Sequence, residues 1–246
     1  MGMLPKTKRW RAIVSEVAST DFSPRATAEV TAHTLDALGS RYRDLAQDQS
    51  VQEAFSYLVE IAKLANTPQA NNSLSNHTPL SLVITLTERL SANSGSLETR
   101  ELVQRATADA LAAWYRQHSS TQADIFGGDV HSNVWQGLGS GAGFCELSRL
   151  YFSRLTERYL NYFLDREASS VLPSLVARED FQQRLREHVA DVSRLSFESA
   201  KITQSYAAGW FNKYARSSTP TAVQKRKFLA YAFDKLREEF RRESKQ

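Results

Sequence analysis

The chain has 246 residues, 41% of them hydrophobic, which is enough for one large domain or two small ones with a real apolar core. Its 31 Lys/Arg and 27 Asp/Glu give a net charge of +4. No apolar run reaches the roughly 18 residues that cross a bilayer, and the N-terminal segment lacks the pattern of a secretory signal. We therefore expect no transmembrane helix and a cytoplasmic location.

Residue usage predicts an all-α fold, because Ala, Leu, Arg, Glu and Gln dominate and sustained β-type alternation is missing. A first helix is expected at about 8–18. Ser23 is a good N-cap with Pro24 at the first helical position, which predicts a helix from there to about residue 46. A third helix follows from about Val51.

The middle of the chain alternates helices with polar segments. Residues 66–79 are rich in Asn and Ser and read as an exposed loop. Helices are expected at 80–90 and 97–118. Residues 119–143 show no regular pattern, and an irregular connection of that length is often functional or mobile.

The strongest periodicity follows at 144–169. Apolar residues recur there at strict intervals of four: Leu147, Tyr151, Leu155, Tyr159 and Phe163. This spacing predicts a long central helix. Two more helices are expected at about 178–214, with a break near Ser196, and at 221–242.

These elements predict a compact multi-helix bundle of about seven to nine helices. We expect one helical domain over residues 1–246. The alternative is a pair of helical subdomains, 1–118 and 144–246, joined by the irregular segment 119–143.

The stretch "VWQGLGSGAGFCELSRLYF" places four glycines before the central helix, at positions 137, 139, 141 and 143. A phosphate-binding loop needs Lys and Ser/Thr after its last glycine, whereas Phe144 and Cys145 stand here. We therefore interpret the segment as a tightly turned or flexible connector, with Ser140 as a turn residue. The single cysteine excludes an internal disulfide and is expected to be a small buried residue.

Three residues of the irregular segment could form an acid/base or metal site: Asp124, Asp129 and His131. No further ligand motif completes the set, so these residues are weak catalytic candidates, and no metal or cofactor is expected. The other four histidines, at 33, 77, 118 and 188, are expected on the surface or with satisfied hydrogen bonds.

Positive charge gathers at the two ends of the chain. Residues 1–12 hold four cations and no acid, and residues 201–246 hold eleven cations against four acids, a net of +7, which leaves −7 for the rest. The last helix is amphipathic with a cationic rim. The candidate binding cations are Lys6, Lys8, Arg9, Arg11, Lys225, Arg226, Lys227, Lys235, Arg241 and Arg242.

Such a helix can contact phosphates, a groove of a partner protein or an anionic membrane, or it can simply be solvated, with Glu238, Glu239 and Glu243 pairing along it. The aromatic residues Tyr206, Trp210, Phe211 and Tyr214 precede it at helical spacing. This spacing favours core packing over base stacking.

Three functions remain open at this point. The first is a non-catalytic helical adaptor, an accessory subunit of a bacterial multi-protein system, with antiviral defence as one setting. It would act through protein contacts of the basic helix and the central segment. The second is a nucleic-acid-binding protein, and the third an enzyme that uses the Asp/His set. The sequence does not determine the oligomeric state.

Overall fold

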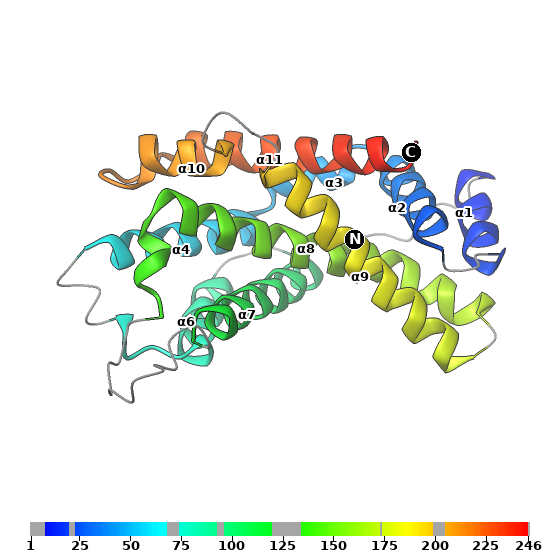
Figure 1. Ribbon diagram of the computed structural model, residues 1–246, viewed down its shortest axis with the longest axis horizontal. Helices are drawn as coiled ribbons and strands as arrows, with labels where there is room; N and C mark the ends of the chain where they lie inside the picture. The colour runs from blue at the N-terminus through cyan, green and yellow to red at the C-terminus, as the bar shows by residue number, and fades with distance from the viewer. Residues whose placement is uncertain are drawn as a thin grey trace, which may run out of the picture.

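Helices make up nearly all of the backbone that the computed structural model describes, which covers residues 8–19, 23–67, 74–92, 96–119, 134–172, 174–198 and 205–245 (Figure 1). The elements are α1 (Lys8–Ser19), α2 (Pro24–Leu38), α3 (Arg41–Asp44), η1 (Leu45–Gln47), α4 (Gln49–Asn66), α6 (Pro79–Ser91), α7 (Leu97–Ser119), η3 (Gln136–Gly139), α8 (Gly141–Val171), α9 (Leu175–Glu198), α10 (Tyr206–Trp210), η4 (Phe211–Ala215) and α11 (Ala222–Glu243). These ranges contain no strand, so the all-α prediction is confirmed.

The predicted count of seven to nine helices is slightly low. Short segments such as α3 and α10 stand apart as separate elements, and periodicity over a few residues is too brief to reveal them. None of the helices in the described ranges is both long and apolar enough to cross a membrane.

The second helix ends earlier than predicted. Gly39 has a φ of 61°, and its N–H donates to the Asp36 carbonyl, which closes α2 at Leu38. The prediction that this helix reaches residue 46 is wrong, because a glycine in the left-handed region is a common helix terminator. The chain then turns through α3 and η1 into α4.

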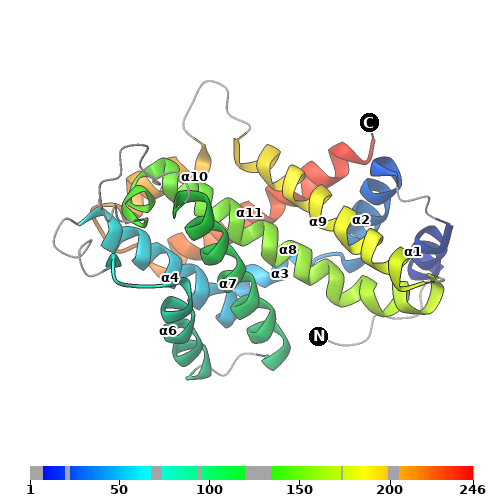
Figure 2. The same ribbon diagram turned by 60° about the horizontal axis from the view of Figure 1, so that its bottom comes forward.

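Helix α8 is the centre of the molecule and contacts α1, α2, α4, α7, α9 and α10 (Figure 2). It begins at Gly141, three residues before the predicted start, because the Ser140 hydroxyl accepts a hydrogen bond from the Gly143 N–H at 2.9 Å. All five apolar residues of the four-residue repeat are buried. The periodicity therefore predicted which face of α8 lies inside.

Aromatic rings join distant parts of the chain in the core. Phe55 of α4 stacks on Phe228 of α11 with ring centroids 4.8 Å apart, and Phe144 of α8 stacks on Phe211 of η4 at 4.6 Å. The Tyr42 hydroxyl lies 2.6 Å from Thr156 Oγ1, and burial raises the pKa of this tyrosine. The apolar core therefore includes residues from both predicted subdomains.

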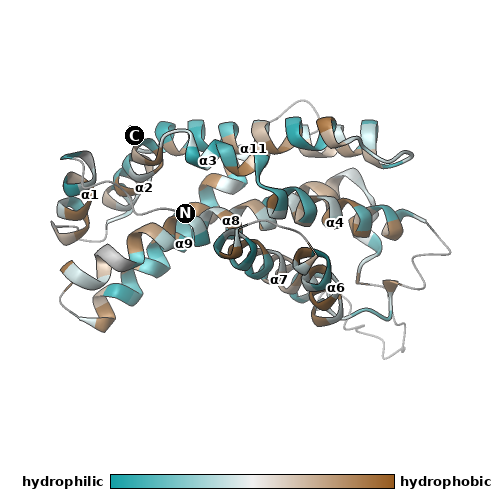
Figure 3. Cartoon of the chain, turned by 180° about the vertical axis from the view of Figure 1, so that it is seen from behind, coloured by the Kyte–Doolittle hydropathy of each residue, from teal (hydrophilic) through white to brown (hydrophobic). Residues whose placement is uncertain are grey.

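The helices are arranged so that α10 and α11 lie along one side of the molecule and α6 and α7 along the opposite side, while α1 and α2 lie at one end (Figure 1). Hydrophilic and hydrophobic residues share the surface of α11, as expected of an amphipathic helix (Figure 3). One side of α11 packs against α2, α3, α4 and α9.

Candidate interaction surface

Helix α11 begins with a capping box. The Thr221 hydroxyl accepts from the Gln224 N–H at 3.2 Å, and the Gln224 side chain accepts from the Thr221 N–H at 2.8 Å. The apolar side is buried: Phe228, Leu229, Ala232, Phe233, Leu236 and Phe240. The capping box and the buried apolar side determine how α11 is rotated about its axis. This rotation decides which cations face outward.

The arginines in the C-terminal half of α11 form ion pairs within the protein itself. Arg241 Nε donates to Asp36 Oδ1 of α2 at 2.7 Å, and Arg237 reaches the same oxygen at 3.4 Å. Arg242 pairs with the buried carboxylate of Glu239. Two of the predicted binding residues, Arg241 and Arg242, are thus held in ion pairs of the protein itself.

Two lysines form hydrogen bonds between α4 and the start of α11. The Lys225 ammonium donates to Ser56 Oγ at 2.7 Å, and Lys63, in the last turn of α4, donates to Thr219 Oγ1 at 2.9 Å. Lys225 is therefore half-buried rather than part of the outer rim. These two contacts position the turn between η4 and α11.

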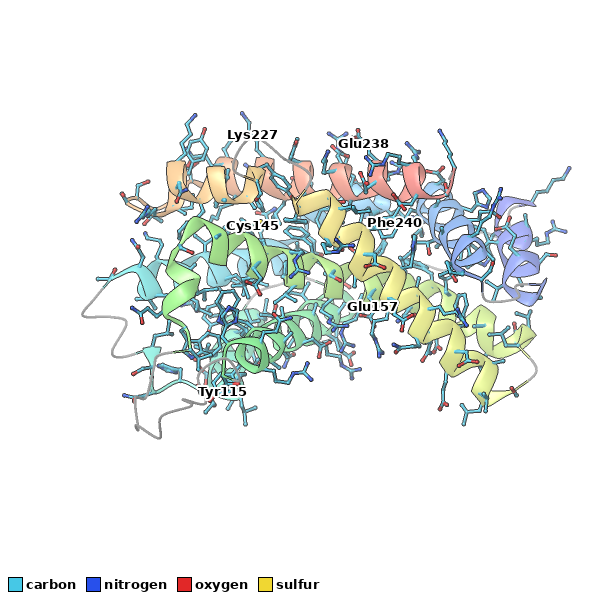
Figure 4. All side chains as sticks on the ribbon, viewed as in Figure 1. Tyr115, Cys145, Glu157, Lys227, Glu238 and Phe240 are labelled. Atoms are coloured by element: carbon cyan, nitrogen blue, oxygen red, sulfur yellow. The ribbon has the colours of Figure 1, made fainter. Side chains whose placement is uncertain are left out.

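Four exposed cations lie between η4 and the second turn of α11. Lys213, Arg216, Arg226 and Lys227, which we call the basic surface, are exposed, and the sequence from 205 to 233 contains no Asp or Glu. Within the described ranges, the last three form no ion pair, and the Lys213 ammonium lies 5.0 Å from the Tyr214 ring centroid. Figure 4 shows Lys227 on the outer side of α11.

Lys213 and Arg216 were missed by the sequence prediction, which concentrated on α11. The signal that could have found them is the acid-free run of 35 residues, 199–233, because isolated cations in such a run have no carboxylate nearby in sequence to pair with. Lys235, which was predicted, is partly exposed further along α11.

Apolar side chains flank Lys227 on the outer side of α11. Val223 and Tyr231, four residues before and after it, are each 51% exposed. The Tyr231 ring is held edge-on against Tyr206 of α10, with centroids 4.9 Å apart. The outer face of the first turns therefore presents both charge and apolar area.

The predicted N-terminal cations lie elsewhere. Lys8 and Arg11 are exposed on α1, Arg9 lies in the same helix, and Lys6 is outside the described residues. Figure 1 places α1 at the end of the molecule away from the η4–α11 turn. The structure thus does not join the described N-terminal cations to the basic surface.

The predicted Asp/His set, Asp124, Asp129 and His131, lies outside the described residues. Among the residues that are described, no group of three or more His, Cys, Asp or Glu side chains is arranged to hold a metal ion.

The glycine-rich segment packs tightly where it precedes α8. A Cβ on Gly143 would lie 2.1 Å from the Gly137 carbonyl oxygen, and one on Gly139 would lie 2.5 Å from the Asn66 nitrogen. Neither position has room for a side chain. Gly139 thus brings η3 against the end of α4, and Gly143 brings the start of α8 against η3.

Cys145 lies half-buried beside this segment. Its sulfur is 2.7 Å from Ser205 Oγ, at the edge of a pocket of about 530 Å³ that Arg149, Asn212 and Arg216 also line. The thiol is thus less buried than the sequence suggested.

A charged groove of about 930 Å³ runs between α7, α8 and α9. In its floor, buried Glu157 accepts hydrogen bonds from Arg154 and from Arg186 of α9, both at 2.8 Å. Arg158 donates to Asp109 of α7 at 3.1 Å. In the sequence, the charged residues of this groove on α8 recur at spacings of three and four and form a polar stripe. The prediction did not single them out, because it followed the apolar repeat of the same helix.

His188 departs from the prediction for the scattered histidines. Its ring meets Phe240 edge-on with centroids 5.5 Å apart, and Nε2 is buried without a hydrogen-bond partner. Burial lowers the pKa of His188 from 6.5 to about 4, because the charged form is poorly solvated there.

Comparison of the chain with protein-family models, with curated proteins and with solved structures gives no match.

Proposed function

We propose that the protein is a non-catalytic helical adaptor, an accessory subunit that binds an acidic surface of a partner protein through the basic surface. The observation that carries this proposal is the combination of outward-facing cations without internal carboxylates and the exposed side chains of Val223 and Tyr231 beside them. Cations attract an acidic partner over about 10 Å, and apolar area then stabilises the contact in a way that salt does not screen.

The apolar residues favour a protein over a nucleic acid as the partner. A phosphate group makes no apolar contact with Val223, whereas Tyr and Arg are enriched at protein interfaces. Further along α11, Arg241 and Arg242 are occupied in ion pairs, so the row of free cations is short. Four cations meeting phosphates would give a salt slope of only about −4 on a double-logarithmic plot.

Nucleic acid remains the second candidate for the same surface. The observation that favours it is the Lys213 ammonium lying over the Tyr214 ring, since cation and aromatic neighbours also bind single strands through phosphate contact and base stacking. The enzymatic alternative rests on Asp124, Asp129 and His131 alone and gains no support from the described residues.

The test compares two charge-reversal variants with equal changes in net charge. The first is Arg216→Glu, Arg226→Glu and Lys227→Glu on the basic surface. The control is Arg25→Glu, Arg184→Glu and Arg194→Glu, at exposed positions on α2 and α9. Tagged protein is purified with its partners from cells that express it, before and after nuclease treatment, and the co-purifying proteins are quantified.

If the proposal is right, a protein co-purifies even after nuclease treatment. Its amount is unchanged with the control variant and falls at least tenfold with the surface variant. A partner lost after nuclease supports nucleic acid instead. Equal recovery with the two variants contradicts a role for the basic surface.

A further inference from the structure

The outer face of α11 has a regular spacing that narrows the choice of partner. Val223, Lys227 and Tyr231 recur every four residues, so the two apolar side chains stand about 12 Å apart along the helix axis with a cation midway. Arg226 flanks this row. One face of a short helix segment therefore offers two apolar contacts and two positive charges.

This face is held in place before any partner arrives. The capping box fixes the first turn of α11, and the contacts of Lys225 with Ser56 and of Lys63 with Thr219 fix its position on α4. The Tyr231 ring rests against Tyr206. The backbone of these turns and the Tyr231 ring therefore have little freedom left to lose on binding, which favours affinity from a small area.

The charge of α11 changes along its length, and this limits how far a partner can extend. Acids appear from Asp234 onward, and Asp234 itself pairs with Arg43 at 3.1 Å. Glu238 lies on the outer side of the helix with Lys227 (Figure 4). An acidic partner is therefore complementary to the first three turns of α11, whereas the exposed carboxylate of Glu238 disfavours its extension further along.

We propose that the partner segment is an acidic amphipathic α-helix that packs alongside the first three turns of α11, an inference that rests on the proposed function. Its apolar residues, seven apart and thus about 10.5 Å along its axis, contact Val223 and Tyr231, and its carboxylates face Arg226 and Lys227. An extended strand fits less well, because a helix face offers no partners for the strand's backbone N–H and C=O groups.

The direct test uses a synthetic peptide of about 18 residues with Leu at helical spacing and Glu on the flanking positions. A second peptide has the same composition with the leucines shuffled, and a single-stranded DNA of about 20 nucleotides is the third probe. Each is titrated by fluorescence anisotropy against the full-length protein and its variants. Circular dichroism checks that every variant is folded.

The informative variant is Val223→Ser with Tyr231→Ser. Its matched control is Leu80→Ser with Ile84→Ser on α6, where the two side chains are also exposed, at 69% and 52%. We expect the amphipathic peptide to lose about tenfold or more in affinity with the first pair and less than about twofold with the second. The shuffled peptide should bind more weakly and respond to neither pair.

Different failures point to different errors. If the charge-reversal variant of the basic surface weakens the amphipathic peptide but Val223→Ser with Tyr231→Ser does not, the helix proposal is wrong and the proposed function stands. If neither variant affects the peptide, the helix proposal is wrong, and the co-purification experiment decides the proposed function. Tighter binding of the DNA than of either peptide, lost on changing Tyr231, assigns the face to nucleic acid and overturns the inference.

Discussion

The packing at Gly143 leaves no room for a side chain. A Cβ there would meet the carbonyl oxygen of Gly137, a backbone atom that cannot move aside without shifting η3. Gly143→Ala is expected to destabilise the protein by about 2 to 4 kcal/mol, as overpacking against backbone does. Urea unfolding followed by circular dichroism measures the change.

The matched control is Gly209→Ala in α10, where a Cβ meets nothing within 4 Å. Alanine favours helix over glycine, so this variant should be neutral or more stable by up to about 1 kcal/mol. Equal losses at the two positions would show that the close approach at Gly143 has been misjudged.

His188 makes stability depend on pH in a defined window. The imidazole has a pKa of about 4 in the folded protein against 6.5 in the unfolded chain. Between these values the unfolded state binds more protons, so stability falls as pH falls from 6.5 to 4, by about 3 kcal/mol across the whole window.

The variant His188→Leu removes this titration. Its free energy of unfolding, measured by denaturant at a series of pH values, should fall less steeply over the window than that of the wild type. Parallel curves for the two proteins would rule out a buried, neutral His188 as the source.

The structure explains which residue-level predictions the sequence could support. The Ser23 cap is local, and its hydroxyl does accept from the Ala26 N–H at 3.2 Å. The pairing of Arg241 with Asp36 joins residues 205 positions apart. No sequence pattern on α11 alone could indicate that this arginine has an internal carboxylate while Lys227 does not.

At the scale of elements, the polar stripe of α8 links this helix to α9 through Glu157 and to α7 through Arg158. The side chain of Glu157 is 8% exposed, while those of Arg154 and Arg186 are 27% and 48% exposed. Glu157→Leu should cost about 1 to 3 kcal/mol, less than a fully buried pair, because the released arginines can turn to water. Denaturant unfolding tests this value.

An exposed acid on α9 provides the comparison. Glu187→Leu removes a carboxylate that only accepts from Gln183 in the same helix, at 2.7 Å, and should change stability by less than about 0.5 kcal/mol. A loss at Glu157 no larger than this would mean that its ion pairs with Arg154 and Arg186 do not stabilise the packing of α8 against α9.

Element boundaries show where periodicity stops being informative. The apolar repeat predicted the existence and the buried face of α8, yet its start depends on the Ser140 cap and on glycines that fit against η3. The end of α2 depends in the same way on the backbone conformation of Gly39. Periodicity reports which face is buried, whereas caps and close contacts decide where a helix begins and ends.

At the scale of the whole molecule, the all-α class was predictable from the sequence, but the arrangement of the helices was not. The candidate surface depends on that arrangement, because α4 meets α11 through Ser56 and Lys225 and meets the turn before α11 through Lys63 and Thr219, pairs that are far apart in sequence. The Asp/His set and the N-terminal Lys6 remain predictions, since they lie outside the described residues.

The acid-free run around the η4–α11 turn also bears on how an encounter begins. Cations with no acid nearby in sequence create a local positive potential at this part of the surface. This potential attracts an approaching anionic body before contact. Added salt should therefore slow association, whereas the lifetime of the complex, which depends on apolar contact, should change little.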